Sequence, residues 1–113
     1  MTPIEFEKLL AELGPARAYE ELTGREDWAD KLVEMIPDHM QYGVVRWVAY
    51  GLRSNPGGFL SAVLMNDLFD AFGRADVESA ARLKDICSWF HNYAPAGARH
   101  YASWDGLVKD AEA

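Results

Sequence analysis

The sequence predicts an all-α fold, a compact single-domain bundle of about six to seven short helices around a central helix at residues 57–73. Three observations support this class. Apolar residues recur three and four positions apart along most of the chain, which is the spacing of one helix face. Capping residues precede these stretches, and Gly or Pro follows them. No alternating apolar and polar pattern of useful length indicates a strand.

Residues 1–36 form an acidic N-terminal segment with three expected helices. Thr2-Pro3-Ile4-Glu5 combines a cap, a proline at the first helical position and a glutamate that can close a capping box. Gly14-Pro15 ends this helix, and a short second helix is expected over residues 16–22. Thr23-Gly24-Arg25-Glu26 repeats the capping pattern and is expected to begin the third helix.

A helical core is expected over residues 37–113. It joins the acidic segment in one domain over residues 1–113, because a piece of 36 residues is too small to fold alone. Asp38-His39-Met40-Gln41 again places a cap and its partner three residues apart and begins the fourth helix. The inner face of this helix is expected to carry Met40, Val44, Trp47, Val48 and Gly51.

Residues 57–73 are the most apolar stretch of the chain and are expected to form its central helix. A wide apolar stripe predicts packing against more than one neighbour, and it comprises Leu60, Leu64, Leu68, Ala71 and Phe72, widened by Met65 and Phe69. Asn66-Asp67 interrupts this stripe. We expect the pair either to hydrogen-bond nearby loops or to form the edge of a binding face.

A sixth helix is expected from Val77 to about Tyr93, capped by Asp76 and antiparallel to the central helix. Its inward residues are expected to be Leu83, Ile86, Cys87 and Phe90. Residues 94–97 end it, and Ser103 is expected to cap a short last helix through Val108.

The charge of the chain disfavours some classes of partner. Residues 1–36 hold four Lys/Arg and nine Asp/Glu, a balance of -5, and residues 37–113 hold seven and nine, a balance of -2. A nucleic-acid backbone requires clustered basic residues, so no direct nucleic-acid binding is expected. An acidic surface suits a basic partner surface instead.

Three features indicate the cytoplasm. No apolar run reaches the roughly 18 residues of a membrane span, so no membrane partner is expected. The N-terminus lacks the basic and apolar regions of a signal peptide. The single cysteine agrees with a reducing compartment.

Cys87 and His91 lie four residues apart on a predicted helix, so both side chains can face one point. They can belong to a metal site completed by His100 or His39, or form a thiolate activated by His91. Zinc sites usually show a second close pair of ligands, which is missing here, and a buried thiol is inert. No metal or cofactor is therefore expected.

Two further motifs have a chemical and a structural interpretation. Asp67 and Asp70 can act as acid and base or hold Mg²⁺, but they also suit the solvated edge of a helix. Residues 55–58 can cradle an anion, yet they lack the Gly-Lys-Ser/Thr ending of a phosphate-binding loop and follow no strand. No catalytic residues are assigned, and the protein is expected not to be an enzyme.

Two surfaces are candidates for binding a partner. The acidic one comprises Glu20, Glu21, Asp27 and Asp30, whose carboxylates on a rigid helical frame can imitate the phosphates of a nucleic acid. The other includes the aromatic residues Trp89 and Tyr101 near the C-terminal loop, since Trp and Tyr are enriched in binding hot spots. Asp67 and Asp70 complete the predicted partner-binding residues.

Over roughly residues 37–97 the sequence resembles a family of small uncharacterised proteins encoded by tailed phages and prophages. The resemblance is carried by residues 57–68, by Gly73-Arg74-Ala75-Asp76, by Ile86, by Trp89-Phe90-His91-Asn92 and by Ala94-Pro95-Ala96-Gly97. It implies an accessory viral protein that acts in the cytoplasm of the host cell. The family carries no known activity, and the acidic first third of the chain falls outside the resemblance.

Together these observations lead us to expect a non-enzymatic protein that binds and inhibits a host protein. The leading candidate for this host protein is a defence complex that handles nucleic acid, which is the kind of target that anti-CRISPR proteins bind. The first alternative is a structural, assembly or regulatory factor of a phage that acts as a homo-oligomer, with a homodimer as the simplest case. The second alternative is a small metalloprotein or enzyme.

Overall fold

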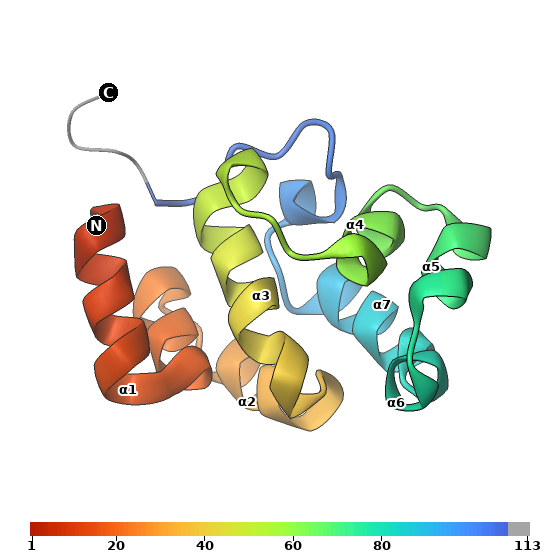
Figure 1. The fold of residues 1–113 in the computed structure, drawn as a ribbon. Helices are drawn as coiled ribbons and strands as arrows, with labels where there is room; N and C mark the ends of the chain where they lie inside the picture. Colours follow the sequence, from red (N-terminus) through yellow and green to blue (C-terminus); the bar gives the residue numbers. More distant parts are fainter. Residues whose placement is uncertain (109–113) are drawn as a thin grey trace.

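Seven α-helices and two short 3-10 helices make up residues 1–108, the part of the chain that this computed structural model describes, and that part contains no strand (Figure 1). In chain order they are α1 (Pro3–Thr23), α2 (Glu26–Met35), α3 (Asp38–Tyr50), η1 (Gly51–Arg53), α4 (Gly58–Leu64), α5 (Leu68–Arg74), α6 (Val77–Ala81), α7 (Leu83–Asn92) and η2 (Ala96–Arg99). The predicted all-α class is confirmed. Residues 109–113 of the predicted domain lie outside the described part.

Helix α1 changes direction where the sequence predicts a break. Gly14 takes φ 81° and ψ 174°, which are not helical angles. The element α1 therefore consists of two helices that meet at a kink at Gly14. Thr2 caps the first turn, because its hydroxyl oxygen accepts a hydrogen bond from the Glu5 amide at 3.2 Å. The second predicted cap is wrong. Thr23 closes α1 by donating to the carbonyl of Tyr19 at 2.8 Å, and Arg25 precedes α2 without a side-chain cap.

The helix at the centre of the fold is α3, which stands between the α1–α2 pair and the α4–α7 half of the molecule (Figure 1). Its predicted inner face is confirmed, since Met40, Val44, Trp47, Val48 and Gly51 are all buried. Buried Gln41 donates its amide N–H to the carbonyl of Ile36 at 3.0 Å and so ties α3 to the end of α2. The cluster of buried apolar side chains runs through α3 and joins Phe6 and Tyr19 of α1 to Ile86 and Trp89 of α7.

The predicted helix over residues 57–73 is wrong as one element, because it is two short helices separated by residues 65–67. Asn66 takes φ 62°, the left-handed conformation that asparagine tolerates at a helix end. The amide of Asn66 bonds to the carbonyl of Val63 at 3.0 Å, and that of Asp67 to the carbonyl of Ala62 at 2.8 Å. These two bonds form a Schellman ending for α4.

The residue that follows the break begins the next helix. Asp67 is the N-cap of α5, and its Oδ1 accepts a hydrogen bond from the Asp70 amide at 3.1 Å. Asn66 therefore ends α4, and Asp67 begins α5. Of the two interpretations left open by the sequence, the local hydrogen-bonding role is the one that the geometry supports.

The predicted helix from Val77 to Tyr93 is also two helices, α6 and α7, which meet at Arg82. The predicted cap is confirmed, since Oδ1 of Asp76 accepts a hydrogen bond from the Ser79 amide at 2.7 Å. Ile86 and Phe90 are buried as predicted. Cys87 is not, because its side chain is exposed.

The predicted last helix from Ser103 to Val108 is absent, and this segment instead lies against the end of α3. The amides of Leu107 and Val108 bond to the carbonyls of Val48 and Ala49 at 3.1 and 2.7 Å. The indole N–H of Trp104 bonds to the carbonyl of Trp47 at 3.2 Å. The carbonyls at the end of a helix lack intrahelical partners, and this segment supplies donors for two of them, those of Val48 and Ala49.

Within residues 1–108, every helix is too short or too polar to cross a lipid bilayer.

Candidate functional site

The four acidic residues predicted on the N-terminal segment are largely paired with arginines. Arg17 of α1 forms ion pairs with Glu20 and, at 2.7 Å, with Asp30 of α2. Arg25 pairs with Asp27 at 2.9 Å, and this hydrogen bond lowers the pKa of the Asp27 carboxyl. Glu21 is exposed and forms no ion pair within residues 1–108. The arrangement braces α1 against α2 and leaves less uncompensated negative charge than the sequence indicates.

Asp67 and Asp70 lie at the other end of the molecule from these acids, since α1 and α5 occupy opposite ends of the fold (Figure 1). Asp67 caps α5, and Asp70 pairs with Arg74 at 2.8 Å. The predicted partner-binding residues are thus not brought together in one surface.

Trp89 is a core residue, which corrects its assignment to a binding surface. Its side chain is 0 % exposed and packs against Tyr19 and Phe90, with ring centroids 5.3 and 5.1 Å apart. Tyr101 is half-buried and stacks on Trp47, with centroids 5.0 Å apart and planes at 8°. One edge of Tyr101 remains available at the wall of a pocket.

The largest unexpected feature is the outer face of α5. Leu68, Phe69 and Phe72 are 62 %, 92 % and 52 % exposed, and helical spacing places them on one side. Ala71 is the buried residue of this helix. Met65 just before α5 and Val77 just after it are also exposed, at 62 % and 90 %. We call Leu68, Phe69 and Phe72 the α5 face. Exposed large apolar side chains in such a group mark interaction sites in soluble proteins.

Acidic residues accompany the α5 face. Residues 67–78 hold Asp67, Asp70, Asp76 and Glu78 against one basic residue, Arg74, and all five are exposed. The local balance of four negative charges and one positive charge is -3. The backbone N–H of Ser79 and the Ser79 side chain lower the pKa of Asp76, which keeps this carboxylate ionised. The α5 face therefore lies in a locally acidic stretch of the chain, which we call its acidic rim.

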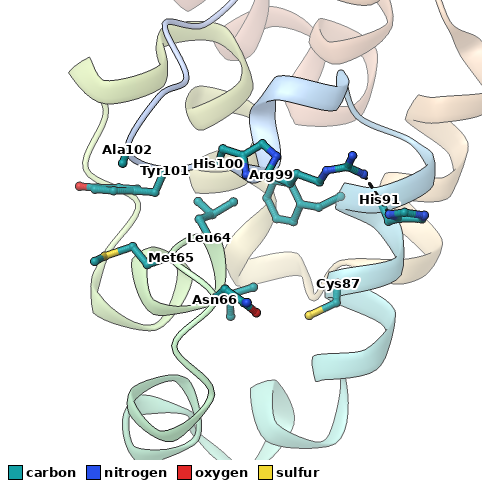
Figure 2. A pocket seen from close by; sticks show the side chains of 11 residues that line it. Leu64, Met65, Asn66, Cys87, His91, Arg99, His100, Tyr101 and Ala102 are labelled. Carbon is teal, nitrogen blue, oxygen red and sulfur yellow. Dashed lines mark hydrogen bonds between the residues drawn. The ribbon is translucent and has the colours of Figure 1, made fainter.

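A pocket of about 500 Å³ opens between the end of α4, α7 and the turn after η2. Its apolar floor includes Leu64 and Phe90, which are almost fully buried. Figure 2 shows Arg99, His91 and His100 along one wall, with Asn66 of the α4–α5 connection facing Cys87 of α7. We call this the α4–α7 pocket. Its volume lies within the range of small-molecule sites.

The pocket contains Cys87, His91 and His100, but not as a metal site. Within residues 1–108 no three His, Cys, Asp or Glu side chains are close enough to hold a metal ion. His39, the other suggested ligand, does not line the pocket and lies 3.6 Å from Asp76 and 3.9 Å from Glu78. Nδ1 of His91 faces Arg99 at 3.0 Å (Figure 2).

Cys87 is expected to react slowly as a nucleophile. Partial burial raises the pKa of its thiol, so less thiolate is present near neutral pH than in a free cysteine. At pH 8 we expect alkylation by iodoacetamide to be slower than for free cysteine, and to accelerate as the pH rises. Mass spectrometry of samples quenched at successive times measures the alkylation rates of Cys87 and of free cysteine. A rate at pH 7 above that of free cysteine would indicate an activated thiolate instead.

Sequence reasoning missed the α5 face and the cationic wall of the pocket. One signal was available for the first. Asn66 followed by an aspartate, with Asp70 three residues later, matches a helix stop and a helix N-cap. A helix of seven residues beginning at Leu68 cannot bury a full apolar stripe against neighbours on two sides. For the second, Arg99 and His91 meet only through the turn at residues 93–98, which no local pattern reveals.

Comparisons of the chain with protein-family models, with curated proteins and with solved structures found no match.

Proposed function

We propose that this protein is a non-enzymatic accessory protein of phage type that binds a host protein through the α5 face. Inhibition of a defence complex that handles nucleic acid is the leading case. The observation that carries the proposal is the exposure of Leu68, Phe69 and Phe72 on one short helix. Leaving three such side chains in water forgoes several kcal/mol of apolar burial, roughly 1.5–3 kcal/mol for each, which a partner recovers.

The chemistry of the rim selects the kind of partner. An apolar face with a local charge of -3 suits a partner segment whose apolar side chains are flanked by Lys or Arg. Proteins that handle nucleic acid carry such basic surfaces. Two copies of this chain meeting face to face would bring their acidic rims together, which disfavours the homodimer alternative.

The proposal is tested by capture from a lysate of a plausible bacterial host with immobilised wild-type protein and with Phe69→Asp. A charge at the centre of an apolar contact is expected to weaken binding at least about 30-fold, as at other interface hot spots. Recovery of the same protein by wild type and its loss with Phe69→Asp support the proposal. If the captured protein is a defence nuclease, adding the wild-type protein is expected to lower its activity, and adding Phe69→Asp is not.

Two matched variants locate the binding surface. Ile4→Asp changes a side chain that is 77 % exposed on α1, at the opposite end of the molecule, and is expected to keep the partner. Glu21→Lys tests imitation of nucleic-acid phosphates by the acidic segment and is also expected to keep it. Equal capture by wild type and Phe69→Asp, or loss with Glu21→Lys alone, would overturn the assignment to α5. A concentration-independent dimer of the wild type that Phe69→Asp dissociates would replace the host partner with a second copy.

A further inference from the structure

The α4–α7 pocket differs in charge from the rest of the chain. The protein has a net charge of -7, yet none of the residues that line this pocket is acidic. Its polar wall carries Arg99, His91 and His100, and its floor is formed by Leu64 and Phe90. A wall with one guanidinium and two imidazoles above an apolar floor is the pattern of a site for an organic anion.

Arg99 is the member of this wall with a free charge. Arg17, Arg25, Arg46, Arg74 and Arg82 each pair with a carboxylate, and for example Arg46 lies 3.1 Å from Glu7. Arg99 has no carboxylate partner within residues 1–108. Its Nη1 instead lies 3.0 Å from Nδ1 of His91 (Figure 2). The positive charge is thus held in place at the pocket without being neutralised.

The contact between Arg99 and His91 fixes what the histidine offers to a ligand. A guanidinium can only donate, so in this contact Nδ1 of His91 is the acceptor. The tautomer that makes this contact presents the N–H of Nε2 as a donor. Arg99 keeps its remaining N–H groups for a ligand. A carboxylate can accept from several such donors at once, and charge-assisted bonds of this kind are the strong ones.

We propose that the α4–α7 pocket binds a small carboxylate with an apolar group, the carboxylate on Arg99 and the apolar group on Leu64 and Phe90. Two sources present this chemistry, a free organic acid and the C-terminal residue of a peptide. The volume of about 500 Å³ accommodates either one aromatic acid or one terminal residue with its neighbour.

The experiment uses the full chain, labelled with ¹⁵N, and four probes in two matched pairs. The first pair is 3-phenylpropionate and 3-phenylpropionamide. The second is acetyl-Ala-Ala-Phe with a free and with an amidated C-terminus. The amide signals of residues 63–66 and 99–102 report occupation of the pocket. At least one acid is expected to shift them in a saturable manner, and its amide is expected to bind about tenfold more weakly or not at all.

Arg99→Gln and Arg46→Gln separate the specific site from general charge. Arg99→Gln is expected to lower the affinity for the acid about tenfold, and Arg46→Gln, at an arginine outside the pocket, to leave it unchanged. Tighter binding of the tripeptide acid identifies a peptide terminus as the source, and tighter binding of 3-phenylpropionate a free acid. Equal shifts with acid and amide, unchanged affinity in Arg99→Gln, or no shifts with either acid would overturn the proposal. The probes involve no host protein, so the result is independent of the function proposed for α5.

Discussion

Replacing Trp89 by alanine is expected to lower the free energy of unfolding by about 3–5 kcal/mol. The indole is 0 % exposed and lies against Tyr19 and Phe90, so its removal leaves a cavity that the surrounding helices cannot close. It also supplies the hydrogen bond from Nε1 to the carbonyl of Trp28 at 3.5 Å. The free energy of unfolding of a native domain is about 5–15 kcal/mol, so this substitution removes a large share of the stability. Urea unfolding followed by circular dichroism measures it.

Phe69→Ala is the matched control for Trp89→Ala, because it removes an aromatic ring that is 92 % exposed. Its effect on the free energy of unfolding is expected to stay within about 0.5 kcal/mol. Comparison of the two variants distinguishes a residue that stabilises the core from one that is available to a partner. A Trp89→Ala protein with unchanged stability that loses a partner would return Trp89 to the binding surface predicted from the sequence.

The helix that the sequence describes best is α3, and the reason is physical. Its predicted inner residues Met40, Val44, Trp47 and Val48 are all buried. Because α3 is packed on several sides, Gln41, Val45 and Ala49 are buried as well. Local signals located its start next to Pro37 and the break of α1 at Gly14, but the predicted cap is wrong, because Pro37 and not Asp38 is the N-cap residue and no side chain caps α3. Where one helix face meets the core along its whole length, the sequence pattern and the structure agree.

Residues 57–73 show why the remainder could not be derived. The apolar spacing continues through residues 65–67, so periodicity alone favours one long helix. The decision is made by backbone hydrogen bonds at Asn66 and Asp67, which compete with continuation of the helix. Once α5 turns away, Leu68, Phe69 and Phe72 remain largely exposed within residues 1–108. Exposure is a property of the tertiary fold, and a strongly apolar stripe predicts burial even when the partner is another molecule.

The candidate sites divide in the same way. The caps at Asp67 and Asp76 follow from local spacing, whereas the pairing of Arg17 with Asp30 joins two helices and lies beyond any local pattern. The α4–α7 pocket is assembled from three separate segments, residues 63–66, 87–91 and 99–102. A cluster of aromatic residues near the C-terminus predicted a surface there, and the structure divides it into a buried Trp89 and a half-buried Tyr101.

Replacing Gly51 by alanine is expected to destabilise the protein by about 2–6 kcal/mol, the sum of backbone strain and steric overlap. Gly51 takes φ 62° and ψ -129°, a combination that residues with a Cβ strongly avoid. A Cβ there would overlap the carbonyl oxygen of Trp104 and lie 2.6 Å from the backbone N of Gly106. These are backbone atoms, which cannot rotate away as a side chain can. The segment at residues 104–108 must therefore leave the end of α3.

The loss should be local before it is global. Detachment of residues 104–108 removes the donors of Leu107 and Val108 from the carbonyls of Val48 and Ala49. Hydrogen exchange of those two amides is expected to accelerate in Gly51→Ala even where the rest of the fold persists. Gly73→Ala is the matched control, since Gly73 lies within α5 with open space around its position. Alanine at position 73 is expected to raise the free energy of unfolding by about 0.5–1 kcal/mol, because alanine has a higher helix propensity than glycine. Equal stabilities of the two variants would contradict the close packing of this C-terminal segment on α3.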